Sequence, residues 1–179
     1  MTLFLLLLLA AVSALVAYIS LQPNTFRIAR SAVIDAPPER IYPLINDLHE
    51  WARWSPWSKL DPQQVVTFEG SPLGAGALMS WAGNKKVGSG KMKITESSQN
   101  ERIRMKLQFL KPMKAINDVQ FELKPVGETR TEVVWTMSGK NEFMGKAISA
   151  FMNCDRMVGG QFEEGLSNLR ALVEAPAQA

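Results

Sequence analysis

The chain has 179 residues, of which 46% are hydrophobic, and carries a formal net charge of +3. This length suits a single domain with one continuous core, and the small charge without an arginine-rich run argues against a nucleic-acid partner. A single histidine and a single cysteine are too few for the usual zinc site, so we expect no metal or other cofactor.

The amino-terminal segment, residues 1–22, is apolar and carries no charge from Leu3 to Ile19. A helix that spans a bilayer needs about 20 such residues. A cleavable signal peptide instead begins with basic residues and has a shorter apolar core. No Lys or Arg precedes this run, so we predict an uncleaved transmembrane helix over 1–22. Small residues at Ala14 and Ala17 leave a cleaved signal peptide as the alternative.

The first basic residues after this segment are Arg27 and Arg30. Because positive charge is enriched on the cytoplasmic side of membrane spans, we expect a single-pass membrane protein with its domain in the cytoplasm. Two arginines also leave an exported domain open. Residues 23–25 form the predicted linker, 26–175 the domain and 176–179 a tail.

A short helix and a tryptophan-rich loop follow the first predicted strand. Asp35 is a candidate N-cap, and Pro37 and Pro38 suit the first positions of a helix, where a backbone N–H is not needed. Pro43 removes an internal hydrogen bond, so this helix is expected to be short and kinked. The loop over 51–57 then carries three tryptophans.

Period-two alternation of polar and apolar residues predicts strands through the middle of the chain. In 102–109 the charged and apolar side chains take opposite faces, which indicates a sheet with one wet face and one buried face. The alternation changes phase near 29–31, where a β-bulge would reconcile the two halves. The seven predicted strands are 26–34, 65–69, 77–81, 88–97, 101–109, 115–126 and 129–138.

One long C-terminal helix is predicted from Asn141 to Glu174, because apolar residues recur there at helical spacings. Such a helix would be about 50 Å long. Gly159 and Gly160 predict a kink or a close approach to another element. Together these elements predict an α+β fold, in which a curved antiparallel sheet of about seven strands wraps around the C-terminal helix.

Aromatic and methionine side chains concentrate on the predicted inner surfaces. Aromatic walls and flexible thioethers suit an adaptable apolar pocket, although the same residues could simply fill a core. Asn117 shares the inward phase of its strand and could orient a polar group of a ligand. The residues predicted to line the pocket are Trp54, Trp57, Met79, Trp81, Met92, Met105, Leu107, Asn117, Val119, Phe121, Trp135 and Phe151.

The sequence holds little that suggests catalysis. His49 stands beside Glu50 without an evident partner, and a general base needs one, so we expect a surface residue. The run over 88–91 lacks the spacing of a phosphate-binding loop. We therefore predict no catalytic residue.

The predicted outer face of the sheet carries a basic strip on adjacent strands. Such a strip could rest on anionic headgroups, where each charge is worth about 1 kcal/mol. An ordinary solvated face is the simpler interpretation, because charge on an exposed sheet also discourages aggregation. The strip consists of Lys91, Lys93, Arg102, Arg104 and Lys106.

Four motifs together resemble one known superfamily. They are R-S-x-x-I at 30–34, W-x-x-W-x-P-W at 51–57, T-x-V-x-W at 131–135 and F-E-x-G-L-x-x-L at 162–169. The chain is thereby similar to the START-like (SRPBCC) helix-grip proteins, in particular their polyketide cyclase/dehydrase and lipid-transport group. The resemblance implies a ligand cavity between sheet and C-terminal helix, with the tryptophan-rich loop at its opening.

Three functions are compatible with these features. The leading hypothesis is a membrane-anchored domain that binds a hydrophobic small molecule or lipid in the cavity. The alternatives are an enzyme of the polyketide cyclase or dehydratase kind that uses the same cavity, and a protein-interaction module without a ligand. Fold alone does not choose among them.

Overall fold

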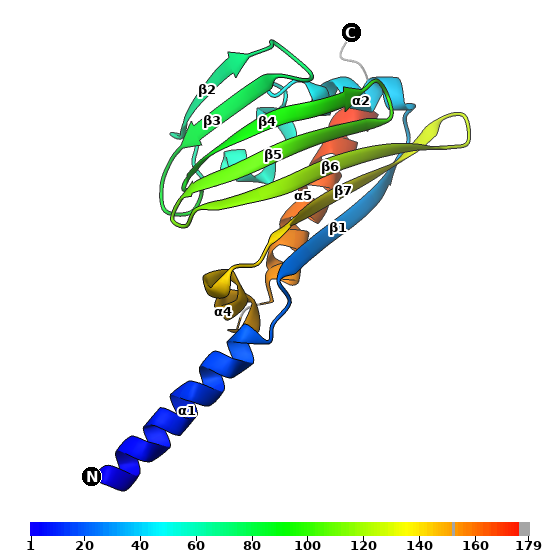
Figure 1. Cartoon of the computed structure of the whole chain (residues 1–179). Coiled ribbons are helices and arrows are strands. Elements are labelled where there is room, and N and C mark those ends of the chain that lie inside the picture. The colour runs from blue at the N-terminus through cyan, green and yellow to red at the C-terminus, as the bar shows by residue number, and fades with distance from the viewer. Residues whose placement is uncertain (152, 176–179) are drawn as a thin grey trace.

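The computed structural model describes residues 1–151 and 153–175. A seven-stranded antiparallel sheet curves around a C-terminal helix, and a long amino-terminal helix projects from the domain (Figure 1). This architecture confirms the predicted α+β fold. The elements are α1 (Thr2–Ser20), β1 (Thr25–Ile34), α2 (Pro38–Asn46), α3 (Trp51–Trp54), the 3-10 helix η1 (Pro56–Lys59), β2 (Val65–Gly70), β3 (Ala77–Ala82), β4 (Ser89–Ser98), β5 (Arg102–Lys111), β6 (Ala115–Val126), β7 (Arg130–Lys140), α4 (Phe143–Phe151) and α5 (Cys154–Glu174).

The sheet is a meander from β2 to β7, and β1 joins it beside β7. Its strand order is β1-β7-β6-β5-β4-β3-β2, and every neighbouring pair is antiparallel. All seven predicted strands are present, and their ends agree with the prediction within two residues. Gly127 forms the β6–β7 turn with a φ of +72°, which glycine adopts without steric cost.

Strand β1 runs beside β7 in unbroken register along its whole length. The β-bulge predicted near 29–31 is therefore wrong. The apparent change of phase arises because Arg30 lies on the inner face together with buried Ile28 and Ile34. In the sequence, a charged side chain on a buried face interrupts the polar–apolar alternation in the same way as a β-bulge does. Register shifts occur instead where β4 pairs with β5.

The C-terminal helix is divided into α4 and α5, so the prediction of one continuous helix from Asn141 to Glu174 is wrong. Asn153 separates them with a ψ of 80°, which is outside the helical region. Its side chain accepts a hydrogen bond from the backbone N–H of Arg156 at 2.9 Å and so caps α5. The apolar pattern continues across this break, and spacing alone therefore does not reveal it.

Helix α2 begins at Pro38, and Pro37 occupies the N-cap position without a side-chain hydrogen bond. The prediction that Asp35 caps this helix is wrong. The backbone N–H of Asp35 instead donates to Oε1 of Glu174 at 2.9 Å, because the chain leaving β1 passes the last turn of α5. Pro43 lies inside the short helix, as predicted.

The core lies between the inner face of the sheet and helices α2, α3 and α5. Phe162, Leu166 and Leu169 form a buried face of α5. The rings of Trp135 and Phe162 stack at a centroid distance of 4.2 Å, and Gly165 permits this because a Cβ there would lie 2.8 Å from the Trp135 ring. Full burial of each large apolar side chain is worth about 1.5–3 kcal/mol, so this face holds α5 against the sheet.

Helix α1 is long and apolar enough to cross a membrane, with a mean hydropathy of 2.6. Its side chains are exposed along almost the whole helix, and Ile19 near its end is buried. Helix α4 packs against α1, and Nζ of Lys146 donates to the backbone carbonyl of Ser20 at 2.9 Å. A signal sequence near the amino terminus has the same length and composition as an anchor, so both interpretations fit this helix.

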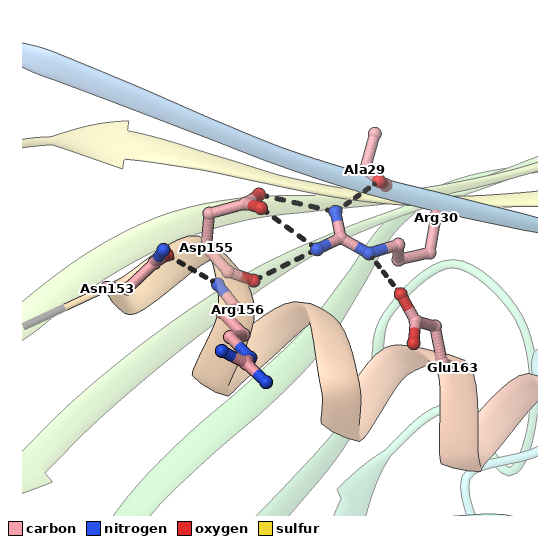
Figure 2. Close-up of polar contacts among 6 residues, drawn as sticks. All are labelled: Ala29, Arg30, Asn153, Asp155, Arg156 and Glu163. Carbon is pink, nitrogen blue, oxygen red and sulfur yellow. Dashed lines mark hydrogen bonds and ion pairs between the residues drawn. The ribbon is translucent and has the colours of Figure 1, made fainter.

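Arg30 on β1 ties the sheet to the first turns of α5 (Figure 2). Its Nε donates to Glu163 at 2.6 Å, and its Nη2 donates to the carboxylate of Asp155 at 2.9 Å. Nη2 also donates to the backbone carbonyl of Asp155 at 3.1 Å, and Nη1 donates to that of Ala29 at 2.9 Å. A Cβ on Gly159 would overlap the guanidinium, so the close approach predicted for this glycine is confirmed. We call this group of contacts the Arg30 clamp.

The charges of the Arg30 clamp hold one another ionised. Hydrogen bonds from Arg30 lower the pKa of Asp155, and the bonds to Asp155 and then Glu163 raise the pKa of Arg30. A carboxyl group whose pKa is lower in the folded state stabilises the fold at neutral pH. This contribution is lost as the pH falls through the lowered pKa.

Substitution of the two adjacent glycines of α5 tests the clamp. Gly160→Ala places its Cβ in open space and should raise the free energy of unfolding by about 0.5–1 kcal/mol, the gain in helix propensity. Gly159→Ala gains the same propensity but displaces the Arg30 guanidinium, so it should be the less stable variant. Urea unfolding of the full chain in detergent, followed by tryptophan fluorescence, measures both. Equal stabilities would contradict the clamp.

Asp155→Asn should lower the free energy of unfolding at neutral pH because it removes the charge that faces Arg30. The difference from the parent protein should shrink as the pH falls below the ordinary aspartate value of 3.8. Glu164→Gln, which removes an exposed acid on the same helix, is the matched control and should change little at any pH. A loss for Asp155→Asn that stays constant with pH would show that the clamp does not act through charge.

Candidate ligand-binding cavity

A cavity of about 530 Å³ lies between the inner face of the sheet and the tryptophan-rich segment that forms α3 and η1. Helix α5 packs on β1, α2, α3 and η1 and so covers the β1 side of the sheet. Strand β2 is exposed throughout and β3 is only half-buried, which shows that cover is incomplete on the other side. The volume is within the range of about 300–1,000 Å³ that is usual for small-molecule sites.

The walls of the cavity are mostly apolar and aromatic. The sheet and its hairpins supply Val66, Phe68, Met79, Trp81, Val87, Met92, Leu107, Phe109, Val119, Trp135 and Met137. The helical side supplies Leu48, Trp51, Ala52, Trp57, Val158 and Phe162. The polar members are His49, Ser55, Ser58, Gln64 and Lys86. Such walls suit an apolar ligand with few polar groups.

The cavity opens where its lining residues reach solvent. These residues are His49, Ala52, Val66, Phe68 and Lys86, all of which are exposed. We call this the cavity mouth. It lies along the edge strand β2, the β3–β4 hairpin and the start of α3.

The structure brings most of the predicted pocket residues together. Those in the cavity walls are Trp57, Met79, Trp81, Met92, Leu107, Val119 and Trp135. Those buried outside the walls are Trp54, Met105, Phe121 and Asn117. The side chain of Phe151 lies outside the part of the chain that the structure describes. A ligand-binding role for these residues stays a prediction.

The side chain of Asn117 packs against the neighbouring strand β7 and is not part of the cavity wall. Its Nδ2 lies 3.8 Å from Sδ of Met137, with the geometry of a weak hydrogen bond. Its side-chain oxygen lies against Gly139 on β7, where a Cβ would clash with it. The side chain is therefore positioned by neighbouring strands and is not aimed at the cavity.

Several wall residues were not among those predicted, although some carry a recognisable signal. Phe109 shares the alternation of Leu107, and Val158 and Phe162 lie on the apolar stripe of α5. The same patterns that predict burial would therefore have found them. Phe68 is 41% exposed on an edge strand, where alternation does not indicate which side chains face a cavity.

Trp135 lines the cavity, and its indole N–H is buried without a partner among the described residues. The residue is 2% exposed, and its Nε1 has no hydrogen-bond partner among the described residues. By contrast, the indole N–H groups of Trp51, Trp54 and Trp81 donate to backbone carbonyls at 2.9, 3.0 and 3.1 Å. Buried polar groups are rarely left unpaired, because the lost hydration costs about 1–3 kcal/mol.

His49 has a partner that the sequence does not reveal. Its Nδ1 lies 2.7 Å from Oδ1 of Asp47, and its ring stacks on Phe68 at a centroid distance of 3.9 Å. The side chain is 52% exposed, which confirms the predicted surface position. The nearby hydroxyl of Ser58 donates to backbone carbonyls and is thus engaged within its own turn.

The basic strip on the outer face of the sheet is largely ion-paired. Arg102 and Arg104 contact the carboxylate of Glu96 at 2.5 and 2.9 Å, and Lys106 contacts Asp118 at 2.5 Å. The hydrogen bond from Arg102 is the largest cause that lowers the pKa of Glu96. The strip therefore resembles an ordinary solvated face more than a surface reserved for headgroups.

A curved antiparallel sheet that grips a helix around an internal cavity defines the helix-grip class. Within this class, residues 25–174 match the family described as polyketide cyclase / dehydrase and lipid transport. The chain belongs to this family, and the resemblance drawn from its four sequence motifs is confirmed. A search of curated proteins found no match.

Solved structures share the fold at low sequence identity. Protein CV1439 from Chromobacterium violaceum is 23% identical with a TM-score of 0.59, and covers 86% of this chain and 99% of its own. The Aha1 dimer from Colwellia psychrerythraea is 19% identical with a TM-score of 0.59 and the same coverage of both chains. A protein from Arthrobacter aurescens is 17% identical with a TM-score of 0.57, and covers 87% of this chain and 88% of its own. These likenesses concern the fold alone.

Trp135→Phe should cost less stability than Trp54→Phe. Both changes remove part of a buried indole, but only Trp54 loses a hydrogen bond, to the carbonyl of Leu44 at 3.0 Å. That loss should add about 1 kcal/mol, whereas Trp135→Phe removes a donor without an acceptor among the described residues. Chemical unfolding of the ligand-free protein measures the difference. Equal losses would mean that the Trp135 donor is satisfied in solution.

Proposed function

We propose that this protein is a membrane-anchored domain that holds a hydrophobic small molecule or lipid in the cavity. The observation that carries this proposal is a cavity of about 530 Å³ whose walls are mostly apolar and aromatic. Such walls supply affinity for an apolar surface, and the few polar wall residues leave few positions for polar groups of a ligand. The proposal therefore concerns a largely apolar molecule.

The distribution of charge supports an apolar cargo. Among the described wall residues, the ionisable side chains are His49 and Lys86, and both lie at the cavity mouth. A charged group deep in the cavity would lose its hydration without an opposite charge to replace it. A ligand with an anionic group would therefore hold that group at the mouth and its apolar part within.

The proposed anchor is α1. Its apolar side chains are exposed over nearly its whole length, which in water would be strongly unfavourable. A bilayer covers such a surface and also satisfies the length requirement of about 20 residues. Extraction of membranes with alkaline carbonate separates an anchor from a cleaved signal sequence, since only the anchored chain stays with the lipid.

Cavity-filling substitutions test ligand binding. Leu107→Trp adds bulk to the cavity wall and should weaken binding of the fluorescent fatty acid cis-parinaric acid at least about tenfold, because it occupies the space of the acyl chain. Val134→Trp, on the outer face of β7, is the matched control and should leave binding unchanged. Titration of the purified full chain in nanodiscs, with empty nanodiscs as the baseline, measures both.

Two results would contradict the proposal. One is a parent protein that neither binds cis-parinaric acid nor yields a co-purified apolar molecule in native mass spectrometry. The other is binding that Leu107→Trp leaves intact, which would place the ligand outside the cavity.

A second candidate is chemistry of the cyclase or dehydratase kind, favoured by the His49–Asp47 pair at the cavity mouth. A carboxylate that holds one imidazole nitrogen orients the other, which is the arrangement of a general base. Native mass spectrometry of protein purified from cells distinguishes the two functions. A binder should carry the same molecule in the parent and in His49→Gln, whereas an enzyme should carry a different precursor in the variant.

A further inference from the structure

One end of the sheet lies next to α1, and it is formed by loops that are distant in sequence. Paired residues of neighbouring strands mark this end from β3 across to β1. The pairs are Ala82 with Ser89, Ser89 with Lys111, Phe109 with Ala115, Asn117 with Gly139 and Lys140 with Thr25. The β3–β4 and β5–β6 hairpins, the start of β1 and the end of β7 therefore share one rim. We call this rim, together with α4, the proximal edge.

The start of β1, the end of β7 and α4 hold this part of the proximal edge close to the end of α1 (Figure 1). The linker over 21–24 spans at most about 14 Å even when fully extended. The backbone N–H of Asn141 donates to the carbonyl of Asn24 at 2.7 Å, which joins the linker to the end of β7. Lys146 of α4 donates to the carbonyl of Ser20, the last residue of α1. A bilayer that contained α1 would therefore have its surface next to this edge.

The proximal edge is strongly basic. Its charged residues are Lys85, Lys86, Lys111, Lys114, Lys140 and Lys146, with Glu142 as the acid among them. Among the described residues none of these cations makes an ion pair with an acidic side chain. The nearby carboxylate of Asp61 is buried and accepts from the backbone N–H of Asn84, so it does not face the lysines.

The opposite end of the sheet has the reverse balance. Acids outnumber bases in the strand ends, turns and helix ends there: Asp35, Glu39, Glu101, Glu122, Glu128, Glu132 and Glu174 against Arg40, Arg102, Lys124 and Arg130. The domain is thus polarised along the direction of its strands. The small net charge of +3 conceals this polarity.

Exposed apolar side chains lie between the cations of the proximal edge. Met113 is 46% exposed in the β5–β6 hairpin, Ile116 is 62% exposed at the start of β6, and Phe143 is 51% exposed at the start of α4. Basic residues interspersed with exposed apolar ones are typical of surfaces that lie in the headgroup region of a bilayer.

We propose that the proximal edge rests on the anionic surface of the bilayer that α1 enters. The proposal rests on the anchoring role of α1 and adds a second, electrostatic contact. Its occupant is lipid, because the edge combines cations, exposed apolar tips and a fixed position beside α1. Lys86 and Val87 belong both to this edge and to the cavity walls, so docking brings part of the cavity mouth to the membrane surface.

Hydrogen–deuterium exchange of the full chain in nanodiscs tests the contact. Segments 82–89 and 109–116 should exchange more slowly in discs of phosphatidylglycerol and phosphatidylcholine than in discs of phosphatidylcholine alone. Concentrated salt should abolish the difference. Lys111→Glu with Lys114→Glu should abolish it too, since each lysine near an anionic surface contributes about fivefold in binding.

The matched control is Lys91→Glu with Lys93→Glu, which makes the same change of charge on the outer face of β4. It should leave the protection of both segments intact. Equal exchange in the two kinds of disc would overturn the proposal, and so would equal loss of protection in both double variants, because the effect would then follow net charge alone.

The anchoring role is tested in the same preparation. A chain that does not co-purify with either disc refutes the anchor, whereas a chain that is incorporated but shows no lipid-dependent protection refutes only the docked edge. Binding of cis-parinaric acid by the incorporated chain is measured independently of both.

Discussion

One helix is too narrow to cover the inner face of a seven-stranded sheet, and the cavity follows from this mismatch. Strands lie about 4.8 Å apart, so seven of them span about 30 Å, whereas a helix with its side chains is about 10–12 Å across. Helices α2 and α3 cover part of the inner face that α5 leaves open, and the space that no helix occupies is the cavity. Aromatic and thioether side chains suit this wall because they are large and do not require a partner on every side.

The Arg30 clamp determines which part of the sheet α5 covers. Arg30 joins the β1 edge to α5 at Asp155 and Glu163, and the stacked rings of Trp135 and Phe162 hold the same part of the helix. Both contacts lie toward the β1 side, so the uncovered strands are those that surround the cavity mouth. The Arg30 clamp and the Trp135–Phe162 stack near the β1 edge thus place the cavity mouth near the opposite edge, at β2.

The strands were predictable from sequence because alternation is a local property, and each strand has one wet and one buried face. The break at Asn153 was not predictable, because a cap there leaves the apolar pattern unchanged. The inward position of Arg30 was not predictable either, because its partner Glu163 is distant along the chain. The cavity walls fall between these cases. Leu107 and Trp135 follow from alternation, whereas Phe68 and His49 reach the mouth only through the curvature of the sheet and the pairing of β2 with β3. Burial, moreover, does not separate a wall such as Val119 from solid core such as Phe121.

The short linker between α1 and β1 limits how far the domain can travel. A carrier that shuttles between two membranes needs a tether as long as the gap, whereas residues 21–24 are pinned at both ends by Lys146 and Asn141. With α1 in a bilayer and a ligand in the cavity, as we propose, the domain would be a stationary binding site at one surface. Its cargo would come from that leaflet or be delivered by a soluble partner, and the rate of exchange would depend on opening of the mouth rather than on diffusion of the domain.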